Sequence, residues 1–240
     1  MLLLIVAASV TVLATGLGAI PVFMLGTRAD RLRSMLTALA AGVMLSASVF
    51  GLILPAVSEG GYLGAVLGLA AGVGFLFLAR GYLNHRLQGK SEASRTSILV
   101  FLVLLVHSLP EGFAVGTSYG TDPATIGLFV VVAISIQNIP EGTSVAIPLA
   151  AQGASPTRQF MAAILSSSPQ IPGAVIAYLL VTSISSLLPF SFGFAAGAML
   201  ALVATQMVPQ AWQENRSQAI GGLVAGSVAM GLLSQLLDVA

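Results

Sequence analysis

The six residues H-S-L-P-E-G at positions 107–112 return as Q-N-I-P-E-G at positions 137–142. In the two copies, His107 matches Gln137 and Glu111 matches Glu141. Residues four apart project from the same face of a helix, so each copy presents two polar side chains one turn apart. One imidazole nitrogen, one amide oxygen and two carboxylates are suitable ligands for a borderline divalent metal ion. The duplicated segment therefore predicts a metal site between two neighbouring helices.

The composition around this segment indicates that lipid covers most of the surface. Of the 240 residues, 57% are hydrophobic and only 7% are charged, with a mean hydropathy of +0.99. A soluble chain would carry about 25% charged residues. The chain has no cysteine, which excludes disulfides and thiolate metal sites. Its basic residues form no continuous stripe, so nucleic acid is not an expected partner.

Long apolar segments predict an all-α polytopic membrane protein, with residues 1–240 as a single transmembrane domain. A helix needs roughly 20 mostly apolar residues to span a bilayer. Eight segments meet this requirement, and the first is long enough to span rather than to be a cleaved signal. The predicted spans are 2–25, 33–56, 62–84, 97–119, 124–149, 158–183, 190–211 and 219–238.

The basic residues then predict the topology. All nine lie in or beside the first, third, fifth and seventh connections: Arg28, Arg31, Arg33, Arg80, Arg86, Lys90, Arg95, Arg158 and Arg216. Basic residues favour the cytoplasmic side of a membrane. We therefore expect a multi-pass protein of a bacterial inner membrane with both termini extracytoplasmic.

Three ionisable residues lie near the middle of predicted spans: His107, Glu111 and Glu141. A carboxylate at the bilayer centre costs roughly 2.5–3.5 kcal/mol, and no Lys or Arg lies at that depth to compensate. Either both carboxyls are protonated or a cation is bound, and the helical spacing favours the cation. A hydrogen-bonded histidine, proline kinks and a protonated helix contact form the purely structural alternative, which does not explain why the whole hexapeptide occurs twice.

Pro110 and Pro140 lie beside the predicted ligands and predict helix breaks at the site. Proline frees the carbonyl four residues earlier, which is tolerated in a membrane where the backbone lines a cavity. Broken helices facing each other are typical of the binding sites of transporters. Gly112 and Gly142 would allow the neighbouring helices to approach closely.

A second repeat links the second and seventh spans. The residues A-A-G-V-M-L at 40–45 match A-A-G-A-M-L at 195–200, and Pro55 and Pro209 follow at similar distances. Ordinary packing of small residues could produce this match alone. Because the paired spans run in opposite directions, we interpret it together with the first repeat as a 3+2+3 inverted-repeat transporter architecture.

With these features, the chain resembles the ZIP (Zrt-, Irt-like protein) family of divalent-metal transporters, in its bacterial branch. The resemblance covers nearly the full chain and is most specific in the two hexapeptides. It implies transport of zinc, or of iron, manganese or cadmium, toward the cytosol by alternating access. It also implies a metal site at His107, Glu111, Gln137 and Glu141. The metal is the transported substrate, with zinc the leading candidate, and no organic cofactor is expected.

The chain departs from family members that hold two metals. Positions where those members often carry acidic or amide ligands are Ser108, Asn138, Gln170 and Gln206 here. We therefore predict one strong site and at most a weak neighbouring one. Gln170 is interpreted as polar lining of the pathway, with packing polarity as the alternative.

Three rival functions remain to be weighed: a channel-like facilitator, an intramembrane metalloenzyme and a metal-binding receptor. Catalytic zinc usually keeps three protein ligands and an open water position. The chain has no H-E-x-x-H motif, and every strong ligand is already assigned to the ion, so an enzyme is disfavoured. The expected partners are the metal ion and the lipid bilayer, and a homodimer is compatible with the sequence.

Overall fold

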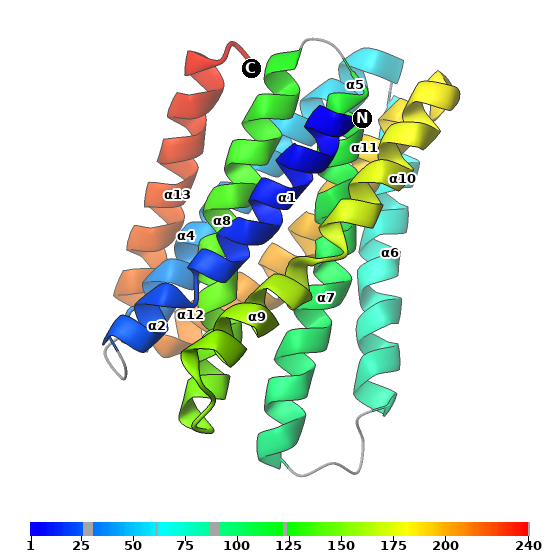
Figure 1. Ribbon diagram of the computed structural model, residues 1–240. Coiled ribbons are helices and arrows are strands. Elements are labelled where there is room, and N and C mark those ends of the chain that lie inside the picture. Colours follow the sequence, from blue (N-terminus) through cyan, green and yellow to red (C-terminus); the bar gives the residue numbers. More distant parts are fainter. Residues whose placement is uncertain (26–30, 61, 87–91, 122–123, 240) are drawn as a thin grey trace.

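The computed structural model describes residues 1–25, 31–60, 62–86, 92–121 and 124–239. Within these ranges every regular element is a helix and none is a strand, which confirms the all-α prediction (Figure 1). The first five elements are α1 (Leu2–Leu17), α2 (Ile20–Leu25), α4 (Arg33–Ala47), the π-helix η1 (Ser48–Ile53) and α5 (Leu54–Gly60). The next five are α6 (Tyr62–Arg86), α7 (Glu92–Tyr119), α8 (Ala124–Ala151), α9 (Pro156–Ser167) and α10 (Gln170–Ser183). The chain ends with the 3-10 helix η2 (Ser185–Leu187), α11 (Leu188–Leu202), the π-helix η3 (Val203–Met207), α12 (Val208–Glu214) and α13 (Arg216–Leu236).

Seven helical stretches in the described residues are long and apolar enough to cross a membrane. They are Leu2–Met24, Arg33–Ser58, Tyr62–Leu83, Ala124–Ala151, Pro156–Ser183, Ser185–Glu214 and Arg216–Leu236. Each overlaps one predicted span, with ends that differ by a few residues. The remaining predicted span, 97–119, coincides with α7, where many side chains lie outside the described residues. The count of eight spans stays a prediction.

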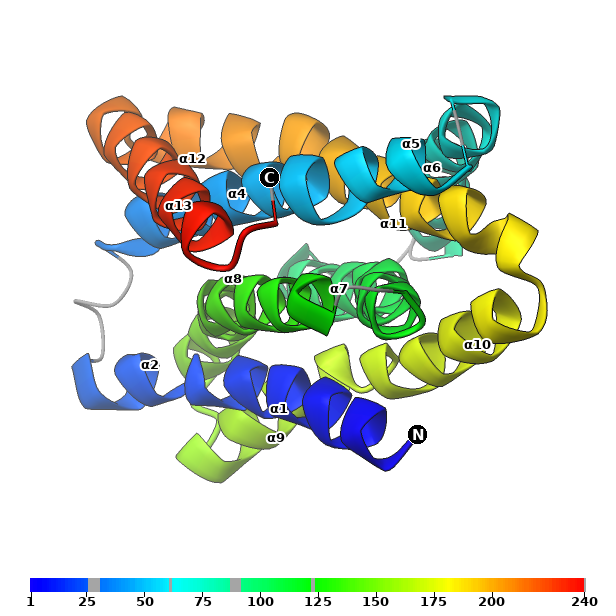
Figure 2. The ribbon, with the colours of Figure 1, turned by 90° about the horizontal axis from the view of Figure 1, so that it is seen from above.

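The helices form three layers when seen from above (Figure 2). The middle layer consists of α7 and α8, which carry the two hexapeptides. One outer layer holds α1, α2, α9 and α10, and the other holds α4, α5, α6, α11, α12 and α13. This order puts the duplicated motif in the interior of the molecule, shielded on both sides.

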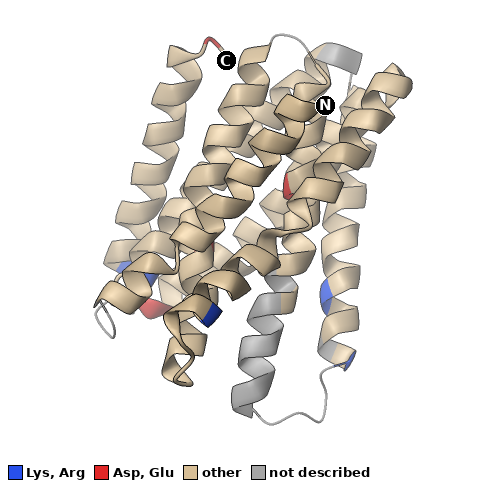
Figure 3. Cartoon of the chain, in the orientation of Figure 1, with Lys and Arg blue, Asp and Glu red and all other residues tan. Residues whose placement is uncertain are grey.

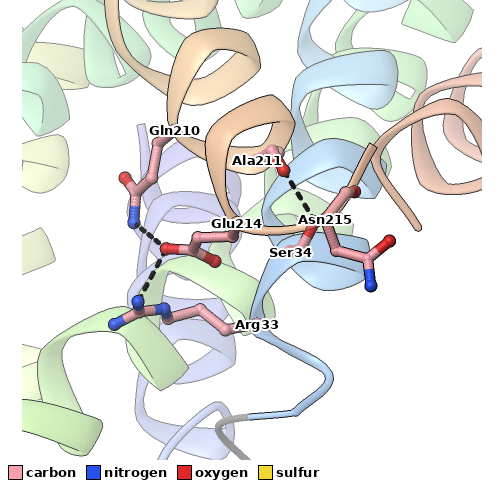
Figure 4. A network of polar contacts seen from close by, with 6 residues as sticks. All are labelled: Arg33, Ser34, Gln210, Ala211, Glu214 and Asn215. Carbon is pink, nitrogen blue, oxygen red and sulfur yellow. Dashed lines mark hydrogen bonds and ion pairs between the residues drawn. The ribbon is translucent and has the colours of Figure 1, made fainter. Parts of the chain in front are cut away.

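The two ends of the bundle differ in charge. The described Lys and Arg residues gather toward one end, which we call the basic end, and both termini lie at the other (Figures 1 and 3). A polar network ties helices together at the basic end (Figure 4). Arg33 forms an ion pair with Glu214 at 2.7 Å, and the Ser34 hydroxyl donates to the Ala211 carbonyl at 2.8 Å. These contacts join the start of α4 to the end of α12.

Glycines bring several pairs of helices into backbone contact. Some pairs lie within the outer layer that holds α4, α6, α11 and α13, and others join the middle layer to the outer layer that holds α1 and α10. A Cβ at any of these glycines would overlap a backbone atom of the facing helix. The pairs are α1 with α8 (Gly18, Gly142), α7 with α10 (Gly112, Gly116), α6 with α11 (Gly68, Gly72, Gly193, Gly197) and α4 with α13 (Gly42, Gly222, Gly226). Close approach through small residues is a common way for membrane helices to associate.

Two π-helices follow the second sequence repeat. η1 begins eight residues after Ala40, and η3 begins eight residues after Ala195, so both occupy the same place relative to A-A-G-x-M-L. A π-helix carries an extra residue per turn and is uncommon outside functional regions. The repeat is therefore also a repeat of local structure.

The prediction that Pro110 and Pro140 break their helices is wrong. α7 continues through Pro110, and α8 continues through Pro140 and Pro148. Each proline removes one backbone hydrogen bond, and the packing of the middle layer on both sides keeps the rest of the helix intact. An interruption does occur in the sixth predicted span, where α9 ends at Ser167 and α10 begins at Gln170.

Candidate metal site

The four predicted ligands lie in the centre of the middle layer. His107 and Glu111 come from α7, and Gln137 and Glu141 come from α8. All four side chains are buried, with 0–5% of their surface exposed. In a soluble protein, Glu is almost never fully buried without a partner. Two buried Glu side chains inside an apolar bundle therefore need a chemical reason.

A direct hydrogen bond joins the two motifs. The Gln137 amide donates from Nε2 to Oε1 of Glu111 at 2.8 Å. Glu141, one turn from Gln137, is close enough to Glu111 for the two carboxyl groups to interact electrostatically. The structure thus brings together three of the four predicted ligands, and His107 lines the same cavity as Glu111.

Several nitrogen and oxygen atoms beside the predicted ligands, all able to coordinate a metal, have no hydrogen-bond partner in the described part of the protein. They are Nδ1 and Nε2 of His107, Oε1 of Gln137, Oε1 of Glu141 and Oδ1 of Asn138, all fully buried. A buried polar atom left unpaired costs about 1–3 kcal/mol, so most such atoms in proteins are paired. An imidazole nitrogen and two oxygens of this kind can instead be satisfied by a cation.

The side chains as they stand do not form a closed cage. Among the described residues, no group of three or more His, Cys, Asp or Glu side chains is arranged to hold a metal. Gln137 faces Glu111 with its amide nitrogen rather than its oxygen. Coordination of a metal shared with Glu111 through the Gln137 oxygen requires this amide to turn.

A second network of neutral groups adjoins Glu111. Gln170, the first residue of α10, donates from Nε2 to Oε2 of Glu111 at 2.7 Å. Its Oε1 accepts from Thr11 Oγ1 at 2.6 Å and from Asn138 Nδ2 at 3.2 Å. Asn138 also donates to the Thr11 carbonyl at 2.7 Å. The break between α9 and α10 thus places Gln170 where it satisfies the second carboxylate oxygen.

Ser108 contributes to the packing of α7 on α9, because its hydroxyl donates to the Ser166 carbonyl at 3.0 Å. Of the three predicted secondary residues, Gln170 is hydrogen-bonded to the predicted ligand Glu111, and Asn138 is hydrogen-bonded to Gln170.

Two methionines complete the surroundings of the site and were missed by the sequence analysis. The small cavity beside His107 and Glu111 is also lined by Met44 and Met199. These are the matching methionines of the A-A-G-x-M-L repeat, which could have indicated them. Thr11 was missed as well, because a lone threonine in an apolar helix gives no signal in the sequence.

Comparison with known proteins gives the family of this chain. The family model described as ZIP zinc transporter matches residues 82–234, which include both hexapeptides. The chain belongs to the ZIP family. It is 34% identical to the zinc transporter GufA of Myxococcus xanthus over 240 residues, covering 93% of this chain and 94% of the relative. It is 33% identical to the zinc transporter ZIPB of Bordetella bronchiseptica over 243 residues, covering 93% and 78%.

A longer relative shows that the ZIP domain also occurs inside larger proteins. The chain is 36% identical to a protein of Arabidopsis thaliana over 232 residues, which is 94% of this chain but only 37% of the plant protein. These relatives carry the names of transporters and not of enzymes, so a metalloenzyme is no longer a candidate. Together with seven apolar helices, the family makes this chain a multi-pass membrane protein that transports a divalent metal.

Proposed function

We propose that this chain carries zinc, or a related divalent ion, across the membrane toward the cytosol through His107, Glu111, Gln137 and Glu141. The observation that carries the proposal is a set of buried nitrogen and oxygen atoms on two adjacent helices of a ZIP protein that have no hydrogen-bond partner among the described residues. The relatives GufA and ZIPB are named zinc transporters, which makes zinc the first ion to test.

The proposed topology has eight spans, with α7 as the fourth. The basic end faces the cytosol by the positive-inside rule, so both termini are extracytoplasmic, and the membrane is a bacterial inner membrane. The gathering of the described basic residues at one end supports this orientation.

The proposed architecture is an inverted repeat that works by alternating access. Its support is the paired π-helices at matching positions and the paired methionines, Met44 and Met199, which reach the same cavity from α4 and α11. In many transporters, halves related in this way rock against each other around a central site.

The proposed chemistry begins when a hydrated ion reaches Glu111 and Glu141. Two carboxylates balance the charge of the ion, which makes its transfer into a low-dielectric interior feasible. His107 and the Gln137 oxygen replace further waters. Any proton on these ligands must leave as the metal binds. A change of access then exposes the site to the cytosol, where reprotonation and scarce free metal favour release.

The proposed site holds one ion. Gln170 donates to Oε2 of Glu111, which is the oxygen that a bridging carboxylate would offer to a second metal. The amide places a partial positive charge where a second cation would sit. We therefore expect one ion per chain at saturating zinc.

Radiometal uptake into proteoliposomes, together with calorimetric zinc binding, tests the function. We expect uptake that saturates with zinc and that is lost in His107→Ala and Glu141→Ala together with binding. Uptake that rises linearly with zinc would favour the channel-like facilitator. Unchanged zinc affinity in both variants would overturn the site.

A further inference from the structure

Arg80 is an arginine inside a membrane-spanning helix. It lies near the basic end of the span Tyr62–Leu83 and is half-buried. The charge of an arginine this near the end of a span usually reaches the aqueous interface, whereas polar side chains of a neighbouring helix hold that of Arg80. Among the residues that the structure describes, no carboxylate lies within ion-pair distance of Arg80.

The partners of Arg80 are two consecutive residues of the π-helix η3. Its Nη1 donates to Thr205 Oγ1 at 3.0 Å. The Gln206 amide is oriented with its oxygen toward the guanidinium, because the reverse orientation would set donors against donors. In this orientation Gln206 accepts from Nε at 3.0 Å and from Nη1 at 3.2 Å. The guanidinium therefore binds α6 to η3 through a fork of three hydrogen bonds.

This fork lies next to the proposed metal site. Leu202, the last residue of α11, lines the cavity that contains His107 and Glu111. Gln206 follows Leu202 by four residues, a little less than one turn of the π-helix η3, toward the basic end.

The space beside the Arg80 guanidinium is unfavourable for a bound divalent cation. Two like charges in a medium of low dielectric repel each other more strongly than in water. Gln206 lies along the chain between Leu202 at the cavity wall and α12 at the basic end, so an exit route along η3 would pass this pair.

We propose that Arg80 gates the exit of the metal site, closed by its hydrogen bonds to Thr205 and Gln206 and guarded against cations by its charge. The proposal rests on the proposed function only for the direction of transport, because closure and charge at this place can be measured without zinc. Two physical roles follow, and they can be separated by two substitutions. Arg80→Lys keeps the charge but cannot form the planar fork. Arg80→Gln removes the charge and most of the fork.

The chain has no cysteine, so a single introduced thiol gives a clean readout. Leu202→Cys places the thiol at the cavity wall. Oriented vesicles are treated from the basic side with a short uncharged maleimide, which reports closure. A cationic and an anionic thiosulfonate are then compared. The ratio of the rates at which they label the thiol reports the electrostatic effect of Arg80 on the approach of ions. Arg86→Gln is the matched control, because Arg86 is on the same helix but stacks on Tyr82 and is exposed.

For the uncharged reagent, we expect labelling of the introduced thiol to accelerate at least fivefold in both Arg80→Gln and Arg80→Lys. For the charged pair, the cation-to-anion ratio should rise at least fivefold in Arg80→Gln and stay near the parent value in Arg80→Lys. Arg86→Gln should change neither readout. The thermal midpoint of each variant in detergent checks that the fold is kept.

Unchanged uncharged labelling in both Arg80 variants would show that Arg80 only anchors α6 to η3, and would overturn the gate. If Arg86→Gln changed the cation-to-anion labelling ratio as much as Arg80→Gln does, the ratio would report the general charge at the membrane surface. That result would also overturn the gate. Failure of the parent protein to bind zinc would instead reject the proposed function while leaving the labelling result intact.

Discussion

Gln137 and Glu111 hold each other across the middle layer through a 2.8 Å hydrogen bond from amide nitrogen to carboxylate oxygen. α7 and α8 run in opposite directions, so the fifth residue of one hexapeptide lies beside the first residue of the other (Figure 1). The bond fixes the height of one copy against the other. It also keeps the amide oxygen of Gln137 free of any partner in the described residues.

Glu111→Gln tests the carboxylate at the centre of this arrangement. The substitution keeps the shape of the side chain but removes one of the two negative charges that balance the ion. We expect zinc affinity to fall at least 100-fold, or about 2.7 kcal/mol, by calorimetry. Glu214→Gln is the matched control, because Glu214 pairs with Arg33 at the basic end and should leave zinc binding unchanged. Similar losses in both variants would reject a local role for Glu111.

His107→Ala and Ser108→Ala compare two adjacent buried residues of α7. Both ring nitrogens of His107 lack a hydrogen-bond partner in the part of the chain that the structure describes, whereas Ser108 donates to the α9 backbone. We expect His107→Ala to weaken zinc binding at least tenfold, or about 1.4 kcal/mol. Ser108→Ala should lower the unfolding temperature slightly with unchanged zinc affinity. The reverse result would move the ligand assignment by one residue.

Gln170→Glu should convert a one-ion site into a two-ion site. The substitution removes the amide donor to Glu111 Oε2 and adds a carboxylate in its place. Elemental analysis of protein saturated with zinc should then give about two ions per chain instead of one. Gln210→Glu adds the same charge at an exposed position and should leave the stoichiometry at one. Two ions per wild-type chain would show that the neutral network does not exclude the second metal.

Zinc binding should weaken as the pH falls. The metal binds the deprotonated forms of Glu111, Glu141 and His107, so protons compete with it at low pH. Each proton released on binding lowers the affinity tenfold per pH unit in the range where that group is protonated. Calorimetry in buffers of different ionisation enthalpy counts these protons. Affinity that stays constant from mildly acidic to neutral pH, with no proton release, would contradict the competition.

Gly142→Ala should destabilise the protein through packing alone. A Cβ at this position would overlap the Thr15 carbonyl of α1, so α1 and α8 must separate. Overpacking of this kind costs typically about 1–3 kcal/mol. Gly231→Ala on α13 is the matched control, because nothing lies within 4 Å of its added Cβ and alanine favours the helix. The unfolding temperature in detergent should fall for the first variant and not for the second.

Much of the fold follows from apolar length and small-residue pattern. Seven of the predicted spans are confirmed within a few residues, because a membrane leaves the backbone few alternatives to a helix. The interruptions inside the spans were not predicted. The first span continues as α2 after Gly18, and the sixth divides before Gln170, where local backbone bonding rather than hydropathy decides.

The site was only partly accessible from the sequence. Helical spacing predicts that His107 lies one turn from Glu111, because it depends on one helix alone. Helical spacing cannot predict the hydrogen bond between Gln170 and Glu111 or the one between Asn138 and Thr11. These contacts depend on how four helices pack together. The proline breaks were predicted wrongly because packing from both outer layers keeps α7 and α8 continuous.

The glycine backbone contacts join the helices in four pairs: α1 with α8, α7 with α10, α6 with α11 and α4 with α13. Two of these pairs attach α1 and α10 to the middle layer, and the other two lie within the opposite outer layer. Among the described glycines, none makes a backbone contact between α7 or α8 and the layer of α4 and α11. At that boundary the glycine contact is with side chains, as where Gly51 meets Phe129. Side chains slide past one another more easily than locked backbones. We therefore expect relative movement of the layers to meet the least resistance at this boundary, which runs through the cavity: His107 and Glu111 lie on one side of it, and Met44 and Met199 lie on the other.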